Sequence, residues 1–315
     1  FAPQAEPEQK PQPPGSSQPA REPPPSSQEP PSSSESSSFQ GPLPELPEQY
    51  KGKLIEETMV GDDSSTFLPL RPGYLRNYTD ISFTKIEEYI KQTPRVKLPN
   101  TKEPLVLVLH THATEGYAEY DAPFYDKRNS WRSTDNNKNI TRVGYAIAAE
   151  LEKQGIGVIH DTTQHDYPSY NGSYDNSAKT IKAMLKRYPT IKIILDVHRD
   201  GIEREGQVVV KPTTVINGKK AAQIMVVSGA DDGTMNMPNW KTNLTFAADL
   251  TNRIEKDYPT LTRPLFFCYR KYNMDLGPVS LLLEVGSNGN TLEESVYTGQ
   301  LVGRSLAALI KEMKQ

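Results

Sequence analysis

The chain has 315 residues and a formal net charge of −3, from 36 Lys and Arg against 39 Asp and Glu. No long basic run occurs, so nucleic acid is excluded as an electrostatic partner. The single cysteine, Cys268, excludes an intrachain disulfide. No apolar stretch approaches the roughly 20 residues that span a bilayer. Because the chain begins with Phe1 rather than Met, we expect a processed form that lacks a signal or anchor segment.

Residues 1–48 have a composition of their own, rich in Pro, Ser, Gln and Glu. Such a segment has too little apolar surface to offset the entropy lost on ordering, so we expect a disordered, extended linker. Two interpretations stay open: a tail without a role, and a spacer that holds a domain away from an anchor.

Residues 49–100 are predicted to be a polar approach segment that contains one short helix. The helix is expected at Thr84–Thr93, where Thr84 and Glu87 have the spacing of a capping box. The stretch Arg95–Pro104 is expected to be a loop.

Residues 101–315 alternate apolar strands with amphipathic helices. Helices are expected at Asn139–Gly155, Ser173–Pro189, Trp240–Pro259 and Thr291–Met313. Strands are expected at Pro104–His110, Ile156–Asp161, Ile191–Asp200, Gly206–Pro212, Ala222–Gly229, Pro264–Tyr272 and Val279–Asn290. Apolar strands without alternation, separated by helices, predict one α/β domain with a mainly parallel sheet covered by helices on both faces.

Titratable side chains follow three of these apolar strands. His110, His112 and Glu115 follow the first strand, His198 lies near the end of the strand at 191–200, and Glu284 follows "SLLL". In open α/β sheets, ligands bind outside the carboxyl ends of the strands. The pattern therefore predicts that these groups meet at one edge of the sheet.

The residue types suit a hydrolytic zinc site, which needs three protein ligands and one open position for water. His112, Glu115 and a distant histidine would supply two imidazoles and a carboxylate, and His198 has the strongest claim among the remaining histidines. Glu284 would carry the proton between the water and the departing amine.

Simpler roles remain open for several of these residues. His110 ends the apolar run and is expected to be buried and hydrogen-bonded without contacting a metal. Asp135 could have no role other than to cap the helix that follows it. Arg199 could bind a substrate carboxylate or pair with a neighbouring acid. Tyr170 and Tyr174 could line a substrate groove or only contribute to packing.

Six motifs together resemble the stage II sporulation protein P family. They are "HTHATEGY", "RSTDNNKNITRVG", "HDTTQHDYPSYNGSYDNS", "LDVHRDG", "NLTFAADL" and "LLLEVGSNGNTLEES". The resemblance extends from about Arg71 to the C-terminus and leaves out the Pro- and Ser-rich start.

This resemblance implies a fold and site similar to the zinc-dependent N-acetylmuramoyl-L-alanine amidases. Matched residue by residue, it makes His112 and His198 zinc ligands and Glu284 the catalytic glutamate. The carboxylate ligand is Glu115 or Asp135, and we prefer Glu115. The "GHGG" motif of the general amidases is absent, so the mouth of the site is expected to differ.

The resemblance further implies a peptidoglycan hydrolase that removes stem peptides from glycan strands and also cleaves cross-links, acting in forespore engulfment. The implied cofactor is Zn²⁺. The implied partners are peptidoglycan and stage II sporulation proteins D and M, and the implied location is extracytoplasmic, at the septal membrane, through an anchor absent from this chain. Two other interpretations are a non-catalytic binding module with an amidase-like fold and a peptidase without amidase action.

Overall fold

The computed structural model of the chain describes residues 45–314. The expected linker at 1–48 lies outside the described residues except for its last four, of which Leu46 is buried. The helices are α1 (Phe83–Gln92), α2 (Thr141–Lys153), α3 (Ser173–Arg187), α4 (Trp240–Asp257) and α5 (Leu292–Met313), with a 3-10 turn at Glu48–Tyr50.

The main sheet has eight strands. Their order is β2 (Phe67–Pro69), β3 (Tyr74–Tyr78), β12 (Leu265–Cys268), β11 (Ile224–Gly229), β13 (Val279–Ser287), β7 (Ile193–Asp200), β4 (Val106–Leu109) and β6 (Val158–His160). The strands β13, β7, β4 and β6 are mutually parallel, and so are β11, β12 and β3. Among the described strands of this sheet, only the pairs β11–β13 and β2–β3 are antiparallel. The prediction of a mainly parallel sheet is confirmed.

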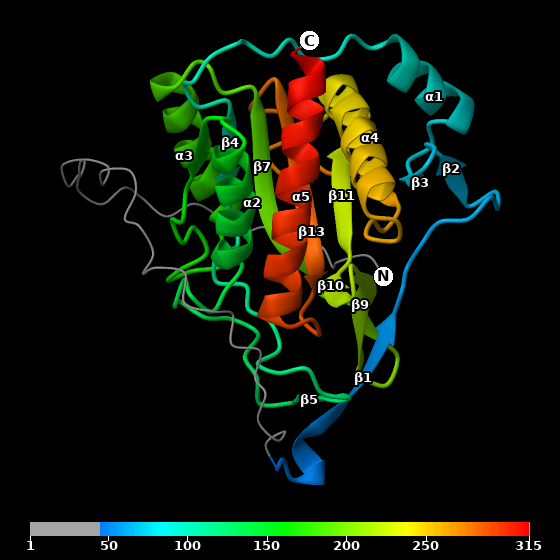
Figure 1. Cartoon of the computed structure of the whole chain (residues 1–315), viewed down its shortest axis with the longest axis vertical. Helices are drawn as coiled ribbons and strands as arrows, with labels where there is room; N and C mark the ends of the chain where they lie inside the picture. The colour runs from blue at the N-terminus through cyan, green and yellow to red at the C-terminus, as the bar shows by residue number, and fades with distance from the viewer. Residues whose placement is uncertain (1–44, 315) are drawn as a thin grey trace. The chain divides into compact units, whose positions relative to one another are not determined.

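Helices cover both faces of this sheet (Figure 1). On β4, Val106 and Val108 belong to the large core cluster that includes side chains of α2, α4 and α5. The alternate residues Leu107 and Leu109 pack instead with Ile181 of α3. Because successive side chains of a strand point to opposite faces, a fully apolar strand has to be covered twice. The expected three-layer arrangement is confirmed.

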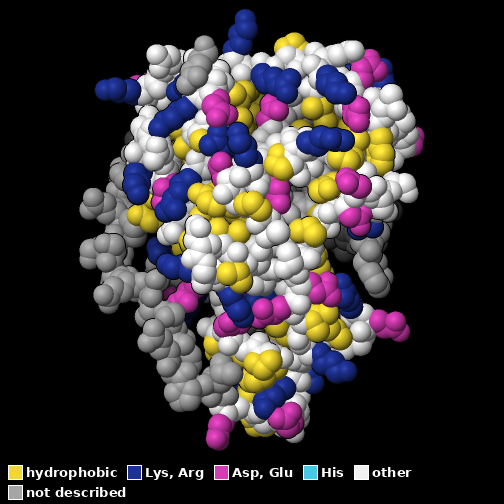
Figure 2. All heavy atoms as spheres, turned by 45° about the vertical axis from the view of Figure 1, so that its right-hand side comes forward, with side chains coloured by type: hydrophobic (Ala, Val, Ile, Leu, Met, Phe, Trp, Pro, Cys, Tyr) yellow, Lys and Arg dark blue, Asp and Glu magenta, His cyan; other side chains and the backbone are white. Residues whose placement is uncertain are grey.

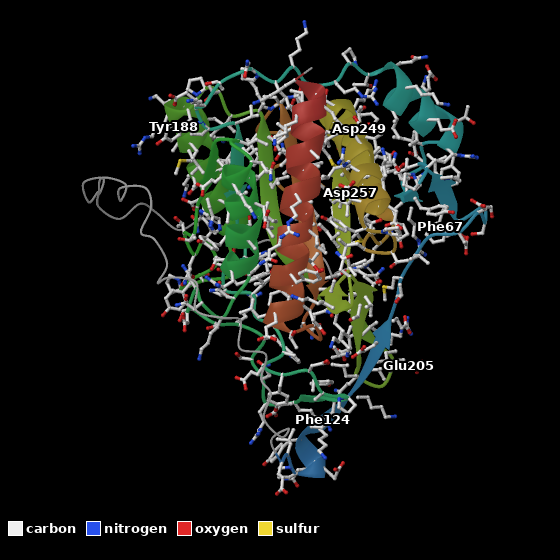
Figure 3. All side chains as sticks on the ribbon, in the orientation of Figure 1. Phe67, Phe124, Tyr188, Glu205, Asp249 and Asp257 are labelled. Carbon is white, nitrogen blue, oxygen red and sulfur yellow. The ribbon has the colours of Figure 1, made fainter. Side chains whose placement is uncertain are left out.

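The helices α4 and α5 are joined by polar contacts as well as by the core. Asp257 at the end of α4, labelled in Figure 3, accepts a hydrogen bond of 2.7 Å from Ser305 Oγ of α5. It also pairs with Arg253, one turn earlier on α4, which contacts Glu312 of α5. This arrangement fixes α5, which directly follows the strand that carries Glu284.

A second, smaller sheet was not predicted. It consists of β10 (Lys219–Ala222), β9 (Val208–Ile216), β1 (Lys51–Glu57) and β5 (Phe124–Asp126), with β8 (Glu203–Arg204) paired to β9. The early strand β1 is parallel to β9, which lies about 150 residues later in the sequence. Residues before 101 thus contribute strands to both sheets.

The start of α1 differs from the prediction. Its N-cap is Ser82, whose side chain accepts a hydrogen bond from the main-chain N of Lys85, so Thr84 lies inside the helix and forms no capping box with Glu87. A capping box does occur at α5, between Thr291 and Glu294.

Within residues 45–314, no helix is long and apolar enough to cross a membrane. Acidic, basic and hydrophobic side chains are interspersed on the face in Figure 2.

Candidate active site

The predicted residues do meet at the carboxyl edge of the main sheet. His112 and Glu115 lie in the turn that follows β4, and His198 and Glu284 lie on the neighbouring strands β7 and β13. Glu284 is the register partner of His198, so the two residues sit side by side. The rings of His112 and His198 contact edge to face, with centroids 5.3 Å apart.

His112 is a buried, neutral imidazole with a nitrogen that finds no partner. The residue is 6% exposed, and its Nδ1 makes no hydrogen bond within residues 45–314. Burial, followed by the charge of His198, lowers the pKa of His112 to about 4. A neutral imidazole with a free nitrogen is the form that binds a metal.

His198 lies between two carboxylates. Its Nε2 is 2.8 Å from Oδ1 of Asp196, and its Nδ1 is 3.7 Å from Oε2 of Glu115. The Asp196 contact falls outside hydrogen-bond geometry and is an ion pair. Burial opposes a charge on His198, but the contact with Asp196 and the charges of Asp196, Glu115 and Glu284 together outweigh burial and raise the pKa of His198 to about 10.

Asp196 is itself held by the turn after β4. Its Oδ1 accepts a hydrogen bond of 2.8 Å from the main-chain N of Thr111, and its Oδ2 accepts one of 2.6 Å from Thr111 Oγ1. Burial favours protonation of Asp196, but the charge of His198 and the contacts with His198 and Thr111 together outweigh burial and lower the pKa of Asp196 to about 2. The carboxylate therefore stays ionised next to His198.

The two candidate carboxylate ligands lie in different environments. Glu115 is 8% exposed, and its Oε2 accepts a hydrogen bond of 3.1 Å from the main-chain N of Arg199. Asp135 is exposed, and its Oδ1 accepts hydrogen bonds from Asn137 in its own turn. Asp135 does not cap α2, because the N-cap of that helix is Ile140, without a side-chain hydrogen bond. The structure brings Glu115, and not Asp135, next to the histidines.

The carboxyl group of Glu284 is largely shielded near the carboxyl end of β13. Its Oε2 is buried without a hydrogen bond within residues 45–314, although the residue as a whole is partly exposed. Burial and then the charge of Asp200 raise the pKa of Glu284 to about 8. The register of β13 shifts just after Glu284, where Gly286 has a φ of 68°. Bulges of this kind re-aim side chains next to active sites.

His110 is buried and hydrogen-bonded away from the other site residues. Its Nδ1 is 2.8 Å from the carbonyl oxygen of Val197, and its Nε2 is 2.9 Å from Nε2 of His160. The first contact makes Nδ1 the donor, so Nε2 accepts from His160. Both nitrogens of His110 are therefore occupied.

The guanidinium of Arg199 contacts main-chain atoms. It donates to the main-chain carbonyl oxygens of Gly116, Trp131 and Asp200, at 2.7, 3.0 and 3.2 Å. No acid pairs with it among residues 45–314. Arg199 therefore ties the loops around Glu115 to the end of β7.

Sequence reasoning assigned no role to Asp196 and left the role of Tyr170 open. Asp196 precedes His198 by two residues on one strand, so the alternation of side chains would have placed both on the same face. Tyr170, which follows β6, stacks on His112 with ring centroids 4.5 Å apart. It lies in an irregular segment, where no periodicity could have shown the contact.

As they stand, no three His, Cys, Asp or Glu side chains within residues 45–314 are arranged to hold a metal ion.

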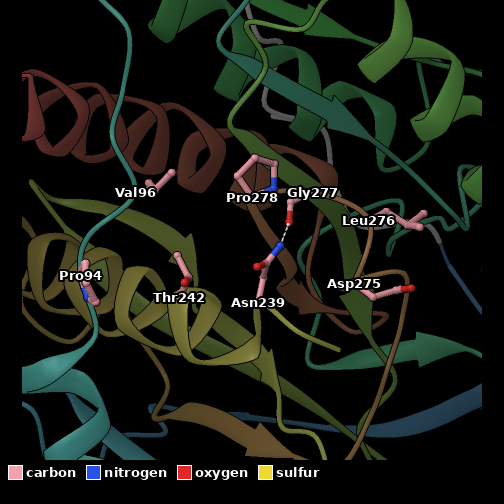
Figure 4. Close-up of a pocket in the computed structure, with 8 residues that line it drawn as sticks. All are labelled: Pro94, Val96, Asn239, Thr242, Asp275, Leu276, Gly277 and Pro278. Carbon is pink, nitrogen blue, oxygen red and sulfur yellow. Dashed lines mark hydrogen bonds between the residues drawn. The ribbon is translucent and has the colours of Figure 1, made fainter. Parts of the chain in front are cut away.

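A separate pocket of about 510 Å³ lies at the amino end of β13, opposite the end that carries Glu284 (Figure 4). Its lining consists of Pro94, Val96, Asn239, Thr242, Asp275, Leu276, Gly277 and Pro278. The candidate catalytic groups do not line it.

The family model described as stage II sporulation protein P (SpoIIP) matches residues 29–307. The chain belongs to this family. Stage II sporulation protein P of Bacillus subtilis (strain 168) is 30% identical to this family member over 201 residues, which are 60% of the chain and 47% of that relative. The chain thus matches about half the length of this relative.

Solved structures align with the chain at low identity. The amidase AmiC2 of Nostoc punctiforme is 13% identical with a TM-score of 0.39, over 68% of this chain and 98% of its own. The CwlD amidase of Clostridioides difficile, in complex with the GerS lipoprotein, is 10% identical with a TM-score of 0.41, over 66% and 98%. A metallo-carboxypeptidase of Burkholderia cenocepacia is 9% identical with a TM-score of 0.36, over 76% and 71%. Likenesses of this size assign no function to this family member.

Proposed function

We propose that the chain is a zinc-dependent N-acetylmuramoyl-L-alanine amidase that removes stem peptides from peptidoglycan. The observation that carries the proposal is the meeting of His112, Glu115, His198 and Glu284 at one edge of the sheet. Family membership supports a cell-wall role in sporulation. Cleavage within peptide cross-links is a second part of the proposal, and it rests on the family resemblance alone.

The donor set fits zinc in its chemistry. His112 offers a buried, unpartnered Nδ1, and the Asp196 contact at Nε2 of His198 leaves its Nδ1 turned towards Glu115. Two imidazoles and one carboxylate are a ligand set of catalytic zinc sites. These side chains are neighbours, but no three of them within residues 45–314 are arranged to hold an ion, so binding would have to bring their ligand atoms closer and remove the proton from His198.

Bound zinc would polarise the scissile carbonyl and lower the pKa of the attacking water. Glu284 takes a proton from that water and passes it to the departing amine, while the C–N bond of the amide breaks and a C–O bond forms. Its raised pKa, about 8, favours the second transfer. Asp196 orients His198, and Arg199 holds Glu115 through its main-chain N.

The remaining proposals concern the setting of the reaction. We propose an extracytoplasmic location at the septal membrane, through an anchor outside residues 45–314, with stage II sporulation proteins D and M as partners. Co-purification of the natural full-length protein with these two proteins tests the partners.

Digestion of purified peptidoglycan, with and without a chelator, tests the activity. We expect intact stem peptides in the mass spectrum, their loss with chelator and their return with added zinc. If the products are cut only within the stem peptide, the chain is a peptidase and not an amidase. If the chain binds peptidoglycan but forms no product, it is a binding module.

A further inference from the structure

His112 is held differently from the other buried histidines at this edge. His110 and His165 each have both ring nitrogens in hydrogen bonds, and His198 faces Asp196. Metal-binding histidines are usually oriented by a hydrogen bond from the nitrogen that does not bind the metal. Within residues 45–314, neither ring nitrogen of His112 has a hydrogen bond, so Nε2 is not fixed in this way and ring contacts have to orient the imidazole.

The most extensive of these ring contacts is with Tyr170. The two rings are nearly parallel, with centroids 4.5 Å apart and planes inclined by 7°. Tyr174 and His198 touch the imidazole edge to face, at 5.6 and 5.3 Å. A stacked ring restricts the plane of the imidazole, and stacking is favourable beyond the area that it buries. Tyr170 is 52% exposed, so it lies on the outer side of the buried His112.

A polar network connects the segment of Tyr170 to the turn that carries His112. Asp166 accepts hydrogen bonds from Thr114 Oγ1 at 2.6 Å and from Arg132 Nη1 at 2.8 Å. The guanidinium of Arg132 lies 4.8 Å from the centroid of the Tyr170 ring. Thr114 stands between His112 and Glu115 in the sequence, so the network links Tyr170 to the turn that supplies both candidate ligands.

We propose that Tyr170 is a positioning residue, whose ring fixes the imidazole of His112 in the orientation that presents Nδ1 to the metal. Asp166, Arg132 and Thr114 hold Tyr170 over that imidazole. The inference rests on the proposed zinc-dependent function and adds a residue that does not itself bind the metal or transfer a proton.

The test compares Tyr170→Ala and Tyr170→Phe with the matched control Tyr167→Ala, a tyrosine of the same segment that is 60% exposed. Zinc affinity is measured by competition with a chelator. The ring protons of His112 are followed by NMR in the zinc-free protein, with assignment by His112→Gln. We expect Tyr170→Ala to weaken zinc binding by about 10- to 100-fold, as for other groups that orient ligands. Tyr170→Phe and Tyr167→Ala should keep the wild-type affinity.

The NMR measurement separates this inference from the proposed function. A stacked tyrosine shields the His112 ring protons, so their signals should move downfield in Tyr170→Ala and stay in place in Tyr170→Phe. Wild-type zinc affinity in Tyr170→Ala would overturn the inference and leave the amidase proposal intact. If the wild-type chain binds no zinc, the amidase proposal fails, and unchanged His112 signals in Tyr170→Ala would then refute the stacking as well.

Discussion

Nε2 of His198 lies 2.8 Å from Oδ1 of Asp196, two residues earlier on β7. Because the ionised carboxylate occupies the Nε2 side, the ring is turned so that Nδ1 faces Glu115. We expect Asp196→Asn to lower zinc affinity by about 10- to 100-fold. In the zinc-free protein, the pKa of His198 should fall from about 10, because the largest of the charges that raise it is gone. Chelator competition and NMR titration of His198 measure both effects.

Two variants control this prediction. Thr111→Val removes the hydroxyl donor to Asp196 but keeps the carboxylate, so its loss of zinc affinity should be smaller. Asp175→Asn makes the same chemical change at an exposed position of α3 and should have no effect. An unchanged pKa of His198 in Asp196→Asn would show that Asp196 does not set the charge of His198.

Replacement of Glu284 separates metal binding from proton transfer. Glu284→Gln keeps the shape of the side chain but cannot take a proton from water. We expect hydrolysis of peptidoglycan to fall by about 100- to 10,000-fold, with zinc still bound. The amount of stem peptide released from peptidoglycan and the amount of bound zinc are measured on the same samples. Glu293→Gln, at an exposed position of α5, is the control. Full activity in Glu284→Gln would refute the proposed role.

The sequence was sufficient to place the candidate site because its residues follow apolar strands. The carboxyl ends of neighbouring parallel strands meet at one edge, so His112, His198 and Glu284 were expected together. Asp196 could have been found by the same argument, since it alternates with His198. The family resemblance left Glu115 and Asp135 as alternatives, and the sequence does not show that the turn after β4 brings Glu115 close to His198.

The contacts that were missed depend on irregular or distant segments. The strand β1 is half buried and pairs with β9, and no local pattern reports a partner so far along the chain. Arg199 could not be assigned, because its partners are main-chain carbonyl oxygens, which every residue carries. Tyr170 reaches His112 from a turn, where side-chain direction follows from the backbone path alone.

The close approach of α2 to the buried His110–His160 pair requires a glycine. A Cβ at Gly144 would lie 2.4 Å from Nε2 of His110 and 2.7 Å from Nε2 of His160. Gly144→Ala should therefore lower the free energy of unfolding by about 1–3 kcal/mol, measured by urea denaturation. Gly201→Ala is the control, because only Arg199 comes as near as 4.0 Å to its Cβ. Equal stability of the two variants would contradict this packing.

The same pair makes stability depend on pH. Burial lowers the pKa of His110 from its ordinary 6.5 to about 4 in the folded chain. Between pH 6.5 and 4 the unfolded chain binds a proton at His110 that the folded chain does not. The free energy of unfolding therefore has its full value above pH 6.5 and decreases as the pH drops towards 4. The difference corresponds to about 3 kcal/mol. Urea denaturation across this range measures it.

His110→Gln removes this titration and is the matching variant. Its overall stability should be lower, since the contact with Val197 is altered. Its stability should nevertheless change less steeply between pH 6.5 and 4, by about 1.4 kcal/mol per pH unit for one proton. If the free energy of unfolding falls equally steeply with pH in both proteins, His110 binds its proton as readily in the folded chain as in the unfolded chain.

Lys211 of β9 is a buried cation, with its side chain 1% exposed. Its Nζ lies 2.6 Å from Asp121, 2.7 Å from Glu294 and 3.3 Å from Glu56. Burial opposes its charge, but Glu294 and Asp121 outweigh burial and raise the pKa of Lys211. Lys211→Met leaves Glu294, only 5% exposed, without its cation. We expect a loss of about 3–5 kcal/mol in the free energy of unfolding.

Two further variants show whether this loss comes from the unpaired carboxylate. Lys220→Met removes a cation that pairs with Glu56 and Asp121 but is 42% exposed, so it should cost no more than about 1 kcal/mol. Lys211→Met combined with Glu294→Gln should recover part of the stability, because no buried charge is left alone. If the double variant is less stable than Lys211→Met, the capping hydrogen bonds of Glu294 to Asn290 and Thr291 outweigh its charge.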